Sequence, residues 1–190
     1  MITIASSLLS LDIVPQVGGK VGQISDVLSG HKFLVSPQKE YQTIPRNGDW
    51  LKHDTSGMDD CFPNVAAGLY PDDPWSTYRL PDLGEWTHGT WDIASVDRHR
   101  AVLTQTGTTL PYFATKTIEF VDEETLLFSY SVRNLGKYSM RFLWSSHPLI
   151  SVGNEYELEL PGDQLTMRVF PDEGLSYTWP ILDGTDLSYQ

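Results

Sequence analysis

The sequence predicts an all-β protein, built as a large antiparallel β-sandwich, and three observations support this fold class. Apolar and polar residues alternate in many short segments, which is the period of strands with one buried face. Helical periodicity is almost missing, and turn-forming residues recur about every 8–12 positions. Aromatic residues, which are common in strands, make up 12% of the chain.

The predicted strands follow one another in pairs that polar turns separate. The first three pairs flank Ser29-Gly30-His31, the charged run DRHR and the acidic run VDEE. The cleanest alternation lies in TLLFSYSVRN (Thr125–Asn134), which predicts one buried and one solvated face. In chain order, the predicted strands are Val21–Leu28, Lys32–Val35, Trp91–Val96, Ala101–Thr106, Thr115–Phe120, Thr125–Arg133, Tyr138–Trp144, Tyr156–Leu160 and Thr166–Phe170.

One long region departs from this pattern. From about Ser36 to Thr90 the chain is rich in Pro, Gly, Asp and Trp and poor in strand signals. A loop of this length in a compact domain is usually functional or disordered, and its aromatic residues argue against disorder. The length of 190 residues predicts one domain over residues 1–190. Because WPILDGTDLSYQ closes on a turn signal, we expect this domain to be incomplete at its C-terminus.

The charge balance narrows the class of ligand. Asp and Glu number 25 against 13 Lys and Arg, which gives a formal net charge of −12. Such a surface repels nucleic acid and anionic lipid, so neutral ligands are favoured. A phosphorylated substrate would need a cluster of Arg and Lys, which the sequence does not indicate.

The sequence lacks the signals that would indicate a membrane span, export, a metal site or a bound nucleotide. No run of 18 apolar residues predicts a membrane span, and the N-terminus lacks the basic start of a signal peptide. The single cysteine, Cys61, can form no internal disulfide. The spacing of Asp97 and His99 lacks further metal ligands, and no nucleotide-binding motif occurs. We therefore expect a cytoplasmic protein with no metal and no cofactor; its oligomeric state stays open.

His147 is the first candidate for chemistry. The stretch RFLWSSHPLI (Arg141–Ile150) places it at the end of an apolar run. Pro148 biases the residue before it toward extended backbone, so His147 could simply end a buried strand. The functional alternative is a general acid or base, because an unperturbed histidine titrates near pH 6.5. The residue pattern leaves both interpretations open.

Two further segments hold candidate ligand-binding residues. GMDDCFPN contains Asp60, and LPDLGEWTHGTWDI contains Glu85, Trp86 and His88. Carboxylates accept hydrogen bonds from hydroxyl groups, and a tryptophan can cover the apolar face of a sugar ring. The structural alternative is a solvated turn in the first segment and a core tryptophan, above all Trp91, in the second.

Taken in order, these segments are similar to those of a known family. The series runs from a P-x-x-G-G-x-x-G motif (Pro15–Gly22) through GMDDCFPNV, LPDLGEWTHGTW, LPYFATKTIEF and SVRNLG to FLWSSHPLI. Its order and spacing resemble the aldose 1-epimerase, or galactose mutarotase-like, family from about Val14 to Ser188. The resemblance implies a supersandwich that binds a neutral sugar in a cleft on one sheet. It also implies interconversion of the α and β anomers of a free aldose, without metal or cofactor.

Only some of the family's site residues have counterparts in this sequence. His147-Pro148 matches one family histidine, and the resemblance makes His147 the acid that protonates the ring oxygen. Leu83 stands where the other family histidine is expected, and the family's C-terminal glutamate has no counterpart here. The base would then lie beyond Gln190 or be Glu85 or His88.

The sequence leaves two functions and one structural alternative open. The first function is an aldose 1-epimerase-like isomerase, with Asp60, Glu85, Trp86 and His88 binding the substrate. The other function is a catalytically impaired carbohydrate-binding module on the same fold. The structural alternative is an incomplete fragment with exposed strand edges.

Overall fold

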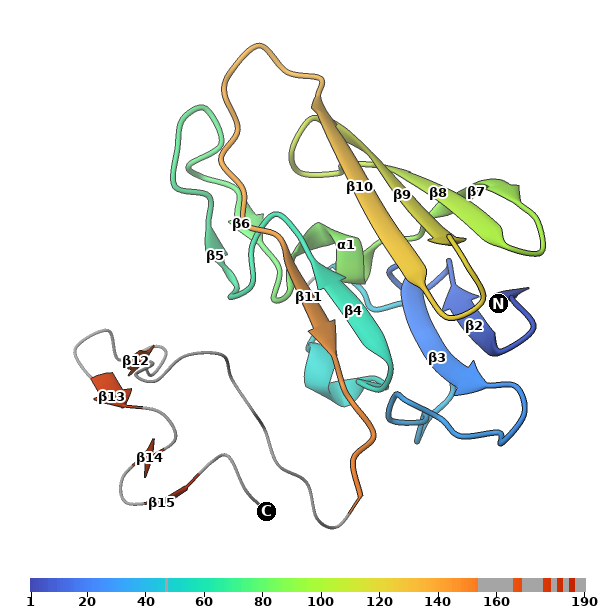
Figure 1. Ribbon diagram of the computed structural model, residues 1–190. Coiled ribbons are helices and arrows are strands. Elements are labelled where there is room, and N and C mark those ends of the chain that lie inside the picture. Colours follow the sequence, from blue (N-terminus) through green and yellow to red (C-terminus); the bar gives the residue numbers. More distant parts are fainter. Residues whose placement is uncertain (47, 154–165, 169–175, 179–180, 183–184, 187–190) are drawn as a thin grey trace. The chain divides into compact units, whose positions relative to one another are not determined.

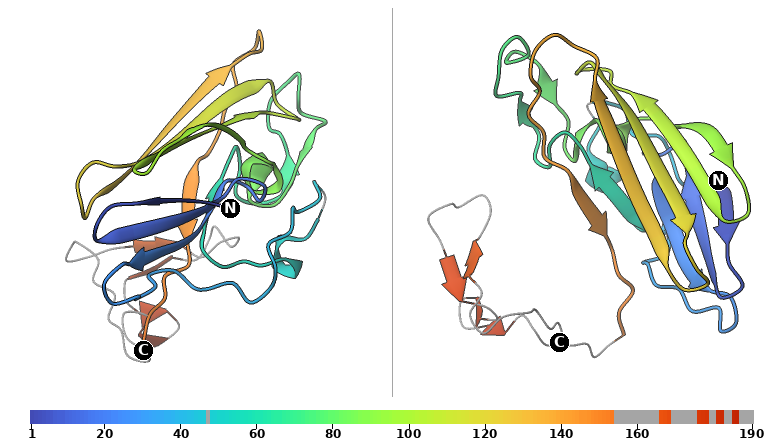
Figure 2. Two further views of the ribbon diagram at one scale, coloured as in Figure 1. Left: turned by 90° about the vertical axis from the view of Figure 1, so that its right-hand side faces the viewer. Right: turned by 45° about the horizontal axis from the view of Figure 1, so that its top comes forward.

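The computed structural model describes residues 1–46, 48–153, 166–168, 176–178, 181–182 and 185–186. The chain divides into two units, Met1–Ser151 and Val152–Gln190, and each is described by itself. The first unit consists mainly of two antiparallel sheets that pack face to face (Figures 1 and 2). The prediction of an all-β antiparallel sandwich is therefore confirmed.

The first sheet has five strands in the order β1-β2-β3-β4-β11. Its N-terminal part is a meander of consecutive antiparallel strands, and a bulge between Asp12 and Ile13 shifts the register of β2 against β3. The last two strands, β4 and β11, come from distant parts of the sequence and pair antiparallel. The strands are β1 (Ile2–Ala5), β2 (Leu9–Val14), β3 (Lys20–Asp26), β4 (Met58–Cys61) and β11 (Ser145–Pro148).

The second sheet has four strands in the order β10-β9-β8-β7 and is built from consecutive hairpins. The turns DRHR and VDEE connect these strands, as predicted from the alternation of apolar and polar residues. Burial alternates along β9 and β10, so every second side chain faces the other sheet. The strands are β7 (Asp92–Val96), β8 (Arg100–Thr106), β9 (Tyr112–Phe120) and β10 (Leu126–Asn134).

Short elements complete both units. The segment between β3 and β7 holds a 3₁₀ turn η1 (Trp50–Lys52), the strand pair β5 (Gly68–Leu69) and β6 (Arg79–Leu80), and the helix α1 (Gly84–His88). The described parts of the second unit form two strand pairs. These are β12 (Thr166–Arg168) with β13 (Ser176–Thr178), and β14 (Ile181–Leu182) with β15 (Thr185–Asp186). Among the described residues, no helix has the length and apolar character that crossing a membrane requires.

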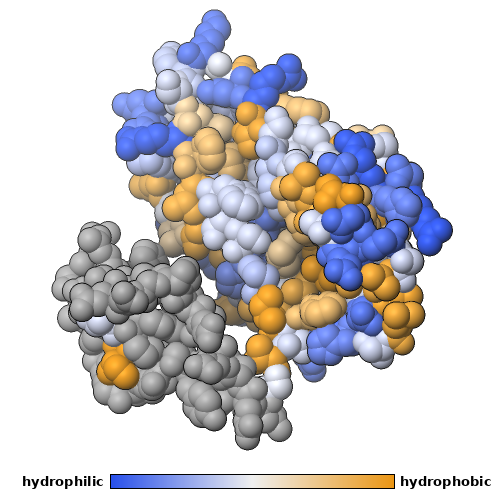
Figure 3. Space-filling model, in the orientation of Figure 1, coloured by the Kyte–Doolittle hydropathy of each residue, from blue (hydrophilic) through white to orange (hydrophobic). Residues whose placement is uncertain are grey.

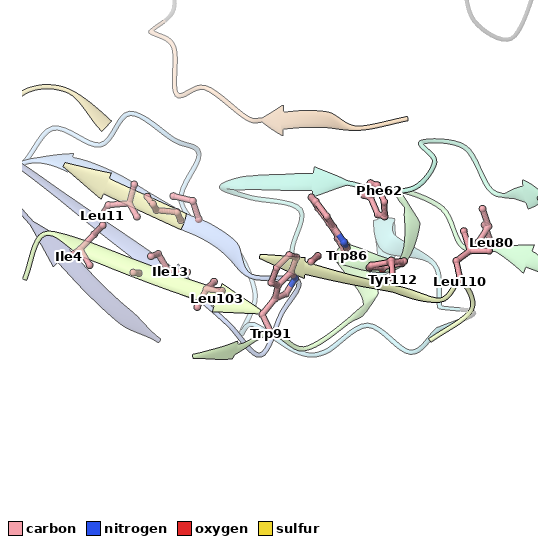
Figure 4. Packing of buried hydrophobic residues seen from close by; sticks show 14 of the residues in the cluster. Ile4, Leu11, Ile13, Phe62, Leu80, Trp86, Trp91, Leu103, Leu110 and Tyr112 are labelled. Atoms are coloured by element: carbon pink, nitrogen blue, oxygen red, sulfur yellow. The ribbon is translucent and has the colours of Figure 1, made fainter. Parts of the chain in front are cut away.

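The core lies between the two sheets of the first unit (Figure 4). Apolar side chains of one sheet meet those of the other, and each fully buried Leu, Ile or Phe contributes roughly 1.5–3 kcal/mol. At one end, Phe62 stacks on Trp86 with ring centroids 4.5 Å apart, and Trp86 meets Trp91 edge-on at 5.2 Å. The core residues of the facing strands include Ile4, Leu11, Ile13, Val21, Leu103, Tyr112, Ala114 and Ile118.

Several strand predictions were wrong or incomplete. Residues 138–144 are not a strand, because backbone groups there bond to loops: Leu143 N–H donates to Pro63 O, and Arg141 N–H donates to the Tyr70 hydroxyl. Residues 32–35 form only isolated bridges. The prediction for 156–160 lies outside the described residues, and that for 166–170 is described only as β12. The sequence analysis missed β1, β2 and β4.

Apolar side chains reach the surface near β10 and the segment that precedes β11. Figure 3 shows this mixed apolar and polar surface in the orientation of Figure 1. Phe142 and Trp144 are more than two-fifths exposed, and both line a pocket of about 310 Å³. The other side chains that line this pocket are Phe62, Trp86, Tyr130 and Val132.

Gly84, the first residue of α1, adopts a left-handed backbone conformation (φ +77°) next to Phe62. A Cβ at this position would lie 2.1 Å from the Phe62 carbonyl oxygen. We expect Gly84→Ala to lower the free energy of unfolding by about 2–3 kcal/mol, through backbone strain and this clash. Urea denaturation followed by circular dichroism measures the loss.

Gly30 is the matched control for Gly84. It also has a positive φ (+72°), but no heavy atom lies within 4 Å of its ideal Cβ. Gly30→Ala therefore reports the backbone cost alone, about 1–2 kcal/mol. Equal losses in the two variants would contradict the steric part of the explanation.

Candidate functional site

Strand β4 carries two adjacent aspartates that face opposite sides of the five-stranded sheet, because successive strand residues alternate in direction. Asp60 points into the sandwich, where its Oδ2 lies 2.5 Å from Lys116 Nζ and 3.0 Å from the Tyr130 hydroxyl. Asp59 points to the other side, where its Oδ2 lies 3.3 Å from Lys20 Nζ and accepts a 3.2 Å hydrogen bond from Trp50 Nε1. Each aspartate thus has its own buried lysine.

His147 lies on β11, directly opposite Asp59 in the antiparallel ladder. Directly paired residues on one face of a sheet are close neighbours, with Cβ atoms about 4.5–5.5 Å apart. The Trp50 ring packs edge-on against the imidazole, with centroids 5.5 Å apart. His147 is half-buried, and its Nδ1 is buried with no hydrogen-bond partner among the described residues. His147, Asp59, Trp50 and Lys20 are called the His147 cluster below.

The electrostatics of this cluster centre on Asp59. Burial raises the pKa of Asp59 above the ordinary value, and the nearby positive charge of Lys20 opposes that rise. The field of His147 also lowers this pKa, so the carboxylate and a protonated imidazole stabilise each other. The net effect is a raised pKa of Asp59, because burial outweighs the two neighbouring positive charges.

Leu83 occupies an apolar position next to the His147 cluster. It packs with Ile44, Trp50 and Cys61 in a small buried group that is separate from the main core. Trp50 belongs to this group and also contacts His147. The position at which the sequence resemblance leads one to expect a second histidine therefore lies in the same apolar group as Trp50, which contacts His147.

The Cys61 thiol is buried, and burial raises its pKa to about 11. At pH 8 about 0.1% of such a thiol is thiolate, against roughly a quarter for a free cysteine. We expect iodoacetamide at pH 8 to modify Cys61 at least about 100-fold more slowly than free cysteine. Mass spectrometry of timed samples measures this rate, and a rate equal to that of free cysteine would contradict the prediction.

Two of the predicted binding residues lie in the interior. Asp60 is 1% exposed and is bound to Lys116 and Tyr130, and Trp86 is fully buried between aromatic rings. Burial and the charge of Asp60 raise the pKa of the Tyr130 hydroxyl. Trp86 also forms one wall of the pocket of about 310 Å³ that Phe142 and Trp144 line.

The other two predicted binding residues, Glu85 and His88, line a different cavity of about 370 Å³ between α1 and β8. Glu85 Oε1 accepts hydrogen bonds from the Thr108 hydroxyl (2.7 Å) and Thr109 N–H (2.6 Å). Both ring nitrogens of His88 lie within hydrogen-bond distance of carbonyl oxygens, those of Pro45 and Asp82. No hydrogen bond or ion pair among the described residues joins Glu85 or His88 to His147.

Sequence reasoning missed several residues of these clusters. Lys116 carried a usable signal, because it shares the buried face of β9 with Tyr112, Ala114 and Ile118 and therefore needed a counter-charge. Lys20 and Trp50 carried none, since Lys20 is distant from Asp59 in the sequence and Trp50 lies in the long segment without strand signals. Within the residues that the structure describes, no three His, Cys, Asp or Glu side chains converge as a possible metal site.

Comparison with known proteins shows a likeness in structure but not in sequence. No family model and no curated protein sequence matches the chain. A galactose mutarotase-like protein from Lactobacillus casei superposes with a TM-score of 0.72 and 15% identity, over 100% of this chain and 66% of that one. A galactose mutarotase-like protein from Clostridium acetobutylicum gives a TM-score of 0.64 and 17% identity, over 96% and 62%. A structure from Escherichia coli K12, described as a candidate aldose 1-epimerase, gives 0.57 and 16%, over 83% and 52%.

These similarities bear on the fold. The chain spans about half to two thirds of the length of the three solved structures. The chain therefore has a galactose mutarotase-like fold.

Proposed function

We propose that this protein interconverts the α and β anomers of a free aldose, with His147 as the general acid. The observation that carries this proposal is the His147 cluster on the outer face of β4 and β11. There the imidazole lies opposite a buried carboxylate, and its buried Nδ1 forms no hydrogen bond with the described residues. The names of the structural neighbours support a sugar as the substrate class.

The proposed reaction is acid-assisted ring opening. Protonated His147 donates to the ring oxygen while the bond between that oxygen and C1 breaks, and the anomeric hydroxyl loses its proton to water. Rotation about C1–C2 and reclosure on the other face complete the interconversion and return the proton to His147. Asp59 is a positioning residue, because it lies directly opposite His147 in the ladder of β4 and β11. Neither metal nor cofactor takes part in this scheme.

The direct test is the rate of mutarotation. Freshly dissolved α-glucose or α-galactose is followed by polarimetry with and without the protein. We expect a rate that increases in proportion to protein concentration. A rate equal to that of buffer alone, at protein concentrations where sugar binding is measurable, would contradict the catalytic proposal.

A carbohydrate-binding module is the second candidate function, and Leu83 is the observation that favours it. Its side chain lies in an apolar group beside Trp50, where a second imidazole would otherwise assist proton transfer. Loss of that group would leave a site that holds a sugar without accelerating its reaction. Calorimetric binding of the same sugars together with a buffer-level mutarotation rate would select this function.

A further inference from the structure

We propose that the cavity between α1 and β8 binds a small zwitterion of the α-amino acid class, with its ammonium group on Glu85 and its carboxylate on Arg46. This cavity, of about 370 Å³, is separate from the His147 cluster and holds opposite charges. The proposal does not depend on the proposed function.

Glu85 supplies the negative end of the cavity. Its side chain is only 6% exposed, and Oε1 is fully engaged by Thr108 and Thr109. Oε2 is buried and accepts no hydrogen bond from the described residues. The Tyr112 hydroxyl lies beside this carboxylate, and burial together with the charge of Glu85 raises the pKa of Tyr112. Its single proton is directed to Gln105 Oε1 at 3.3 Å. A buried carboxylate oxygen without a donor is costly, and an ammonium group satisfies both its hydrogen-bonding capacity and its charge.

Arg46 supplies the positive end. It lines the same cavity and donates to the Thr109 hydroxyl, the residue whose N–H binds Glu85. Among the described residues Arg46 forms no ion pair, so its remaining N–H groups can bind a carboxylate in the two-pronged geometry that guanidinium favours. Thr109 therefore places both charges near each other but not in a salt bridge.

The neutral groups of the cavity argue against a sugar as its ligand. His88, Thr90, Thr108 and Tyr112 already use their side-chain hydrogen-bonding atoms within the protein. A monosaccharide with several hydroxyl groups would find few free partners, and it would leave the charge of Glu85 uncompensated. A zwitterion matches the two charged groups of the lining, Glu85 and Arg46.

Calorimetry with glycine, L-alanine, L-serine and L-leucine tests the proposal. We expect at least one to bind the full chain. Its analogue without the carboxylate (the amino-acid amide) and its analogue without the amine (the hydroxy acid) should each bind at least about 10-fold more weakly, because each loses one charge-assisted contact. No binding by any of the four amino acids, or equal binding by the analogues, would overturn the proposal.

Variants assign the binding to this cavity. We expect Glu85→Gln and Arg46→Gln each to weaken the amino acid at least about 10-fold, while His147→Ala and the exposed Arg98→Gln leave its affinity unchanged. Arg46 is exposed, so its variant reports binding even if Glu85→Gln fails to fold. Unchanged affinity in Arg46→Gln, or glucose binding that Glu85→Gln abolishes, would overturn the assignment.

Discussion

Replacement of Lys116 by methionine is expected to lower the free energy of unfolding by about 3–5 kcal/mol. Lys116 is fully buried, and its Nζ lies 2.5 Å from Asp60 Oδ2 and donates to Gly19 O at 3.0 Å. The variant leaves the Asp60 carboxylate in the sandwich interior with the Tyr130 hydroxyl but without a counter-charge. An uncompensated buried charge costs far more than the lost attraction between the pair, which explains the large effect.

The double variant Lys116→Met, Asp60→Leu distinguishes the cost of an unpaired buried charge from the cost of altered side-chain packing. Because it removes both charges, we expect it to regain most of the stability that the single variant loses. The exposed Lys137→Met is the matched control and should change stability by less than about 0.5 kcal/mol. Urea denaturation of all three measures the differences. A single variant as stable as the parent chain would show that Asp60 is not held as an anion.

The strands that sequence reasoning found are those with a partner close by in the chain. The alternation in 125–134 is enough to predict β10, since β9 precedes it across one acidic turn. Strand β4 has no such partner, because it pairs with β3 and with β11, which lie far away in the sequence. Its residues MDDC also show no alternation, because both faces of this strand are covered and each carries a buried aspartate.

The dependence on contacts between distant parts of the sequence also explains why only part of the candidate site was predicted. His147 was found from its own short motif, but its neighbours were not, because Asp59 and Trp50 reach it only through the pairing of β4 with β11 and the packing of η1. Asp60 and Trp86 were chosen for chemistry that also suits a buried ion pair and an aromatic core. Both residues lie in the segment that was predicted as a long loop. Whether a side chain there is buried or exposed depends on the tertiary structure, which the composition of the segment does not reveal.

Replacement of His147 by alanine is expected to slow protein-dependent mutarotation by about 10²–10⁴-fold, the range for removal of a positioned general acid. His147→Gln should be equally slow, because the amide keeps hydrogen-bonding atoms but carries no transferable proton. His99→Ala, at the exposed turn between β7 and β8, is the matched control and should retain the parent rate. Melting temperatures of the three variants separate lost chemistry from lost structure. If His147→Ala keeps the parent rate while the fold is intact, the acid is another residue and the imidazole only fills the space between Trp50 and Asp59.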